Sequence, residues 1–254
     1  MSGSPVTLDA LIAAFALPAH PPPRRVPKAS LADNAPTAAD RRLIDGKLAR
    51  LEWVAALNPA TTGIASATSE GLEVGVINLL AARTRGPMPP RLAEIVQRAI
   101  PQPVILVHAD ETADAPAALS LAPKRAAERE AGRVVVKALH DSGELRGGES
   151  DFLATLALSR LPSRDLVALY AGLVERVEAL IAARAGGRPF RLPSSPTELG
   201  IWREALAQID ELETQIAARA AAMRKEVRLA TRVEQGEAVR QLRAKLDKCR
   251  AMLE

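Results

Sequence analysis

The feature that most constrains this chain is an amphipathic pattern that starts with a helix-capping signal at Ser195 and runs to the C-terminus. Ser195, Pro196 and Glu198 suit the N-cap, first and third positions of a helix, as in a capping box. Apolar residues then recur at three- and four-residue spacing, which predicts a long helix with an apolar seam for partner binding. The seam positions of its first half are Leu199, Trp202, Leu206, Ile209, Ile216, Met223 and Val227.

The second half of this pattern, from Val239 to Leu253, is out of phase with the first, and Gly236 lies in the gap. The helix can run through with a skip in its seam, or fold back between residues 233 and 236 into a hairpin. A single glycine costs only about 1 kcal/mol in a helix, which favours continuity. We therefore expect one continuous or kinked helix of roughly 58 residues, about 87 Å long.

Composition limits the remaining possibilities. A chain of 254 residues with 48% hydrophobic and 25% charged residues can form one globular domain plus an extension. Only 2% of the residues are aromatic, which argues against proteins that stack unpaired bases on aromatic platforms. The single cysteine, Cys249, excludes internal disulfides and, with no signal peptide or membrane span expected, predicts a cytoplasmic protein. A net charge of +4 permits contact with an acidic polymer.

Upstream of the long C-terminal helix, the periodicity predicts helices over 7–15, 37–57, 90–100 and 163–184. The prolines of 20–28 predict an extended strap. Five short aliphatic or β-branched runs predict strands over 62–66, 72–81, 103–109, 117–122 and 133–140, and 141–150 reads as a loop. This order favours an α+β fold with a mostly antiparallel sheet of about five strands and flanking helices. The expected parts are 1–36 (helix and strap), 37–192 (α+β domain) and 193–254 (helical arm).

Several short motifs occur in the order typical of one bacterial family. They are Arg25-Val26-Pro27-Lys28, the passage from Trp53 through Leu57-Asn58-Pro59-Ala60-Thr61, the strand Ile100-Pro101-Gln102-Pro103-Val104-Ile105-Leu106-Val107, and Ala122-Pro123-Lys124. On these motifs, residues 25–170 resemble the family catalogued as domain of unknown function 4391, and the coiled-coil tail also fits. The family's third-strand motif usually has an aromatic residue where this chain has Val107.

Members of such a family are typically encoded beside DNA methyltransferases and superfamily-2 helicases, in restriction-like or anti-phage defence modules. The resemblance therefore implies an accessory subunit with those enzymes as partners. It names no chemistry, because a fold or a neighbourhood does not define a reaction.

A catalytic site is not expected from the residues. His108, Asp110, His140 and Asp141 lie at predicted strand ends and could converge as a metal or acid/base site, although polar residues commonly cap such ends. The acid-x-lysine triplet of a restriction-type nuclease occurs only within a predicted helix, at Asp45-Gly46-Lys47. Phosphate-binding glycine loops are absent from the sequence, so we expect no cofactor and no metal.

Basic residues are the better binding candidates. Arg224, Arg228 and Arg232 recur every four residues beside the seam and could follow DNA phosphates, although a solvated helix face would have the same pattern. Arg25 and Lys28 on the strap, and Lys124 after the fourth strand, are smaller candidates of the same kind.

The sequence thus predicts a non-enzymatic adaptor that docks on a helicase or DNA methyltransferase. The long arm would bind the partner or a second copy, with non-specific contacts to the backbone of double-stranded DNA. The alternative is a cryptic metal-dependent nuclease of the same system.

Overall fold

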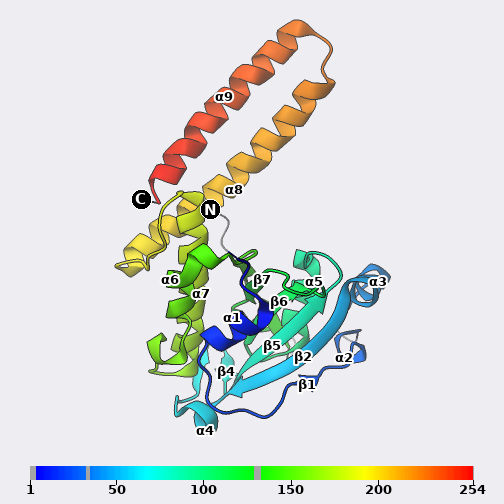
Figure 1. Ribbon diagram of the computed structural model, residues 1–254. Helices are drawn as coiled ribbons and strands as arrows, with labels where there is room; N and C mark the ends of the chain where they lie inside the picture. The colour runs from blue at the N-terminus through cyan, green and yellow to red at the C-terminus, as the bar shows by residue number, and fades with distance from the viewer. Residues whose placement is uncertain (1–3, 33–34, 129–132, 254) are drawn as a thin grey trace. The chain divides into compact units, whose positions relative to one another are not determined.

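The computed structural model describes residues 4–32, 35–128 and 133–253. The chain forms two compact units, Met1–Val177 and Glu178–Glu254, and helix α7 (Leu166–Ala185) contributes to both. The first unit is a mixed α+β structure and the second is helical (Figure 1). None of the described helices is long and apolar enough to cross a membrane.

A six-stranded sheet forms the centre of the α+β unit, in the order β1-β2-β5-β6-β7-β10. Its strands are β1 (Arg24–Arg25), β2 (Leu48–Leu57), β5 (Ile77–Thr84), β6 (Val104–Asp110), β7 (Ala117–Leu121) and β10 (His140–Asp141). Neighbours are antiparallel except β5 and β6, which are parallel because α5 (Pro90–Ala99) returns the chain between them. The predicted mostly antiparallel α+β fold is confirmed.

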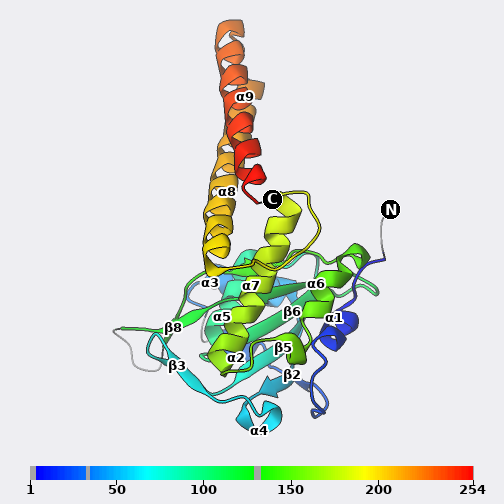
Figure 2. The ribbon, with the colours of Figure 1, turned by 90° about the vertical axis from the view of Figure 1, so that its left-hand side faces the viewer.

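Helices cover both faces of this sheet (Figure 2). On one face, α2 (Ala29–Ala32), α3 (Ala38–Lys47) and α5 share an aliphatic core with β2, β5 and β6. On the other, α1 (Leu8–Ala14) packs on β6, β7 and α6 (Ser150–Thr155). The buried Tyr170 hydroxyl of α7 donates to the Val104 carbonyl at 2.9 Å and accepts from the Ala122 N–H at 2.8 Å, which ties α7 to the sheet.

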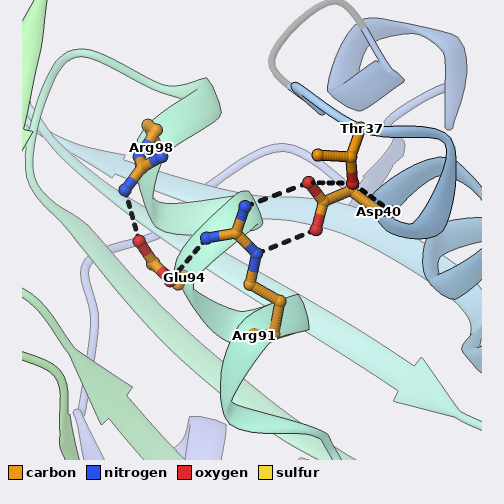
Figure 3. Close-up of polar contacts among 5 residues, drawn as sticks. All are labelled: Thr37, Asp40, Arg91, Glu94 and Arg98. Atoms are coloured by element: carbon orange, nitrogen blue, oxygen red, sulfur yellow. Dashed lines mark hydrogen bonds and ion pairs between the residues drawn. The ribbon is translucent and has the colours of Figure 1, made fainter.

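The helix pair α3 and α5 is joined by a bidentate ion pair (Figure 3). Arg91 Nε lies 2.8 Å from Asp40 Oδ1, and Arg91 Nη2 lies 3.0 Å from Asp40 Oδ2. Asp40 also accepts from the Thr37 hydroxyl, and Glu94 joins Arg91 to Arg98. The bond to Arg91 is the main reason that the pKa of Asp40 falls to about 2.

The predicted helix over 37–57 is wrong in its second half, because α3 ends at Lys47 and β2 follows directly. Pairing of β2 with β5 shifts register between Leu48 and Arg50 and again between Trp53 and Ala55. Each bulge adds a residue and turns the next side chain to the other face. Buried side chains therefore recur every three residues, as in a helix, at Leu48, Leu51, Val54 and Leu57.

Smaller differences follow from local turns. The predicted strand over 62–66 is wrong, because the Asn58 side chain caps the short helix α4 (Pro59–Thr62). The run 72–81 contains two strands, β4 (Leu72–Val74) and β5, and 133–140 contains β9 and the first residue of β10. The remaining elements are β3 (Ala67–Ser69) paired with β4, β8 (Lys124–Ala126) paired with β9 (Val134–Val136), and the 3-10 turns η1 (Gly147–Glu149) and η2 (Leu158–Arg160).

The other predicted elements are confirmed in kind. Helix α1 has Thr7 as its N-cap, α5 and α7 lie where periodicity places them, and β6 and β7 lie in the predicted strand runs 103–109 and 117–122. The strap over 20–28 is extended and contributes β1. The expected loop over 141–150 holds β10's last residue and η1, and α6 begins at its end.

The favoured continuous C-terminal helix is wrong, because the arm is a hairpin of α8 (Pro196–Lys225) and α9 (Leu229–Ala251) (Figure 1). Glu226 and Arg228 have extended backbones at the turn, and the Glu226 carboxylate accepts the Arg228 N–H at 2.8 Å. Gly236 lies inside α9. The hairpin is favoured because it buries the two half-seams against each other, which a straight helix would leave exposed. The Ser195 N-cap is as predicted.

Candidate functional site

A groove of about 540 Å³ runs along the outer edge of the sheet, where the proline-rich strap lies beside β2. We call it the β1–β2 groove. Its lining residues are Pro21, Pro22, Arg24, Arg25, Val26, Pro27, Trp53, Val54, Ala55 and Ala56. Four prolines hold the strap extended, and a groove with preformed walls loses little freedom when a ligand binds.

Trp53 is the large apolar side chain of this groove. It pairs with Arg24 across β1 and β2, so the two side chains project from the same face of the sheet. Its indole Nε1 donates to the Ala55 carbonyl at 3.1 Å, across the second β2 bulge. The polar atom of the indole is thus satisfied, while 41% of the residue's surface stays exposed. The aromatic surface is available for contact with a ligand.

The charge of the groove is positive. Arg24 and Arg25 are exposed, and neither forms an ion pair with another described residue; Arg25 lies opposite Glu52 in the strand register, and the Glu52 carboxylate pairs with Arg50. Among the residues that the structure describes, no aspartate or glutamate lines the groove. Arg25 was predicted as a binding residue and lies in it, whereas Lys28 is half-buried and does not line it. A ligand with negative charge beside an apolar group would match this surface.

The groove offers few free backbone N–H and C=O groups for hydrogen bonds to a ligand. The carbonyl of Ala55 already accepts from Trp53, and that of Ala56 accepts from the Thr61 hydroxyl at 2.9 Å. The prolines of the strap have no N–H to donate. Because these groups are satisfied or missing, an added strand would find few partners there. Recognition would depend on side chains, chiefly Trp53 and the two arginines.

A second basic surface lies at the turn between α8 and α9. The three predicted DNA candidates meet there, with Arg224 in the last turn of α8, Arg228 at the N-cap of α9 and Arg232 in its first turn. All three are exposed and none forms an ion pair with another described residue. With the neighbouring Lys225 they form what we call the basic tip, around Val227, which is 90% exposed. The hairpin gathers into one cluster the arginines that a single helix would spread along a ridge.

The predicted partner-binding seam is mostly occupied by the helical unit itself. Leu199, Trp202 and Ile209 are buried, the last two in a core that α9 and the end of α7 complete. Leu206 and Ile216 pack against that core and are half-buried, as is Met223. Of the seven seam candidates, Val227 alone is exposed. The periodicity indicated helix packing correctly, but the packing partner lies in the same chain.

Lys124 was predicted to contact DNA, and this prediction is wrong because the side chain is buried. Its ammonium donates to the Ile100 carbonyl at 2.7 Å and to the Gln102 carbonyl at 2.8 Å. Burial lowers the pKa of Lys124 to about 7. The residue therefore fixes the turn between α5 and β6.

The polar residues at the strand ends act mainly as caps. Asp110 accepts from the Gly86 and Thr112 N–H groups, and Asp141 accepts from the Gly143 N–H. His108 Nε2 lies 3.0 Å from Asp141 Oδ2, in the wall of a pocket of about 410 Å³. His140 does not line that pocket. Within the described residues, no three His, Cys, Asp or Glu side chains stand close enough to share a metal ion.

Sequence reasoning missed Trp53 as a candidate, because the helical reading of 37–57 hid its place on strand β2, beside the strap. A tryptophan followed closely by a proline turn was the available signal.

In comparisons with known proteins, neither the curated proteins nor the solved structures contain a significant match to this chain. The family described as Domain of unknown function (DUF4391) matches over residues 18–246, most of the chain. The chain therefore belongs to the DUF4391 family, as its motifs indicated.

Proposed function

We propose that this chain is a non-enzymatic adaptor subunit of a bacterial anti-phage defence or restriction-modification-like system. Its β1–β2 groove docks on a protein partner, for which the family resemblance suggests a superfamily-2 helicase or a DNA methyltransferase. The observation that carries the proposal is Trp53, which is 41% exposed in a groove lined by two arginines without carboxylate partners.

The composition of the groove supports a protein ligand. Tryptophan and arginine are the side chains most enriched among interface residues that dominate binding energy. The apolar walls suit an apolar anchor, and the arginines Arg24 and Arg25 suit adjacent carboxylates. The partner segment is therefore expected to be acidic and to carry at least one large apolar side chain. The arm is not the primary docking surface, because its own packing buries the seam.

The test is co-expression of the tagged chain with a superfamily-2 helicase or a DNA methyltransferase from the same genome, followed by measurement of the dissociation constant. Trp53→Ala should weaken binding at least about thirtyfold, as expected for a central aromatic anchor. Replacing Arg24 and Arg25 together by Gln should weaken it less and reduce its dependence on salt.

Ile201→Ala is the matched control. Ile201 is 42% exposed, against 41% for Trp53, and lies on α8 outside the groove. Binding should be unchanged in this variant. If a folded Trp53→Ala chain binds the tested partner as tightly as the Ile201→Ala chain, docking through the groove is refuted.

The basic tip supports a second, auxiliary function, which is contact with the DNA backbone. Arg224, Lys225 and Arg228 flank the turn, and its one acid, Glu226, is engaged by the Arg228 N–H. The tip offers charge without a set of base-reading or stacking side chains, so binding would be independent of sequence. Replacing Arg224, Arg228 and Arg232 by Gln should flatten the salt dependence of binding by up to about three phosphate contacts.

That measurement needs an intact assembly, because loss of the partner would also weaken DNA binding. The triple variant must therefore copurify normally with the co-expressed partner. Unaltered affinity and salt slope on two unrelated duplexes would show that the tip is only a solvated surface.

The rival nuclease activity has a direct test. We expect the purified chain to leave DNA intact with Mg²⁺ or Mn²⁺, because Asp110 is engaged in backbone caps and Lys124 in two carbonyl contacts. Cleavage that disappears on substitution of Asp110 or Lys124 would overturn the adaptor proposal. Cleavage that survives both substitutions would indicate contamination.

A further inference from the structure

The hairpin is packed differently along its length. At its base, Ala179 and Ala182 from the end of α7 supply a third helix against Trp202 and Leu246. Farther toward the turn, α8 and α9 pack on each other. Of the seam side chains of that part, Ile216 and Met223 are half-buried, while Val239 is buried. A two-helix layer cannot enclose its own apolar seam, and this part of the hairpin is incomplete.

A groove of about 400 Å³ lies on one face of the hairpin, between α8 and α9, and its lining residues Gln208 and Cys249 place it nearer the base than the turn. We call it the hairpin groove. Leu212 of α8, Leu242 of α9 and Met252, the C-cap of α9, give it an apolar lining, and Met252 is 49% exposed. Helices of a bundle fill such a groove with the side chains of a facing layer.

Charges around the hairpin groove are divided between the two helices. Glu211 lies on the α8 side, and Lys245 and Lys248 lie on the α9 side. None of the three forms an ion pair with another described residue, and Glu211 accepts only from Gln215 of its own helix, at 3.0 Å. An acidic edge and a basic edge on one face make that face complementary to itself.

The positions of these charges along the helix axes determine which orientation of a second copy is favoured. Gln208 contacts Cys249 at 3.3 Å and Glu213 contacts Arg250 at 3.0 Å, so Glu211 lies near the level of Lys248. A twofold axis parallel to the helices would place α8 of each copy against α9 of the other, with Glu211 opposite the lysines. An axis perpendicular to the helices would place α8 on α8 and oppose Glu211 to itself. Charge favours the first arrangement.

We propose that a second copy of this chain occupies the hairpin groove and forms a four-helix bundle with α8 packed on α9 of the partner copy. In this arrangement both turns lie at the same end of the bundle. The two basic tips are then neighbours and could contact the same DNA. This consequence for DNA binding rests on the DNA contact proposed above. The dimer itself depends on neither DNA nor a protein partner.

The test is a charge reversal in the full chain without DNA or partner, read by light scattering and sedimentation over a range of concentrations. The unchanged chain should be a dimer. Glu211→Lys should weaken the dimer at least about tenfold, because like charges then face each other twice. Lys245→Glu with Lys248→Glu should do the same. Mixing the two variants should restore a dimer of one copy each, since opposite charges then face each other at both contacts.

Asp210→Lys is the matched control, since Asp210 is exposed on the same helix and does not line the groove. It should leave the dimer intact. Recovery of the mixed dimer also shows that each variant is folded. A monomeric unchanged chain would overturn the proposal, and so would a Glu211→Lys chain that dimerises as well as the Asp210→Lys chain. Neither result would bear on docking through Trp53, which is measured with a partner present.

Discussion

The chain has two tryptophans, and they have opposite surroundings. Trp202, at the base of the hairpin, is 2% exposed and packs with Ala205 and Ile209. The guanidinium carbons of Arg188 and Arg191 lie 4.5 and 4.8 Å from its ring centroid. Trp53 also has two arginines close in the fold, yet 41% of it is exposed.

The contrast indicates that one tryptophan site is complete within the chain and the other is not. Around Trp202 the chain itself supplies the cations and the apolar cover, so the site is complete and structural. Around Trp53 the same residue types are present, but the cover is missing and the arginines have no carboxylates. An aromatic ring with cations and no cover is the surface that a protein partner completes. One side chain type thus serves stability in one unit and recognition in the other.

The largest expected effect concerns stability. Trp202→Ala should lower the free energy of unfolding of the helical unit by about 3–5 kcal/mol, because it leaves a large cavity. Trp53→Ala should cost about 1 kcal/mol or less, since much of the side chain is already in water. Urea unfolding followed by circular dichroism measures both. Comparable losses in the two variants would contradict the division between a structural and a recognition tryptophan.

Local chemistry predicted much of the fold. The Ser195 cap gave the start of α8, because an N-cap hydrogen bond depends on neighbouring residues alone. The apolar runs of β6 and β7 were recognisable because both faces of a central strand are buried. The β2 bulges depend on pairing with a strand that follows much later, and they turned a strand into an apparent helix.

The binding surfaces were less predictable for the same reason. The turn at Glu226–Arg228 contains neither glycine nor proline, so only the gain from packing two seams selects it. Lys124 follows β7 with no sign that Ile100 and Gln102 would present their carbonyls to it. Burial is a property of the folded neighbourhood, and a single sequence does not display it.

A smaller loss of stability is expected in acid, at the carboxylate that holds Arg191 beside Trp202. Glu198 accepts from Arg191 Nη2 at 2.6 Å and from the Ser194 hydroxyl at 2.7 Å, which lowers its pKa from 4.5 to about 2. The folded state therefore holds the carboxylate more strongly than the unfolded state does. Its stabilising contribution is present above pH 4.5 and is lost as the pH falls toward 2.

Single-tryptophan chains report this loss separately for each unit. In a Trp53→Phe chain, Trp202 emission should change over that acid range, and Glu198→Gln should remove the change. The matched control is Asp40→Asn, which removes the acid-sensitive ion pair with Arg91 in the other unit. If Asp40→Asn alters the acid response of Trp202 as much as Glu198→Gln does, the arginine at the ring is not held by Glu198.

The smallest expected effect concerns whether the cations of the β1–β2 groove face Trp53. Substitution of Arg24 and Arg25 should leave stability unchanged, because both side chains are exposed. In a Trp202→Phe chain, iodide should quench Trp53 more strongly than neutral acrylamide does, relative to free tryptophan, because the arginines concentrate anions at the ring. Replacing both arginines by Gln should reduce iodide quenching by a factor of about two at constant ionic strength, and leave acrylamide quenching unchanged. An equal reduction for both quenchers would mean that the variant closes the groove sterically. An anion preference that survives the substitutions would place its source elsewhere, and the acidic partner segment inferred from these arginines would lose its basis.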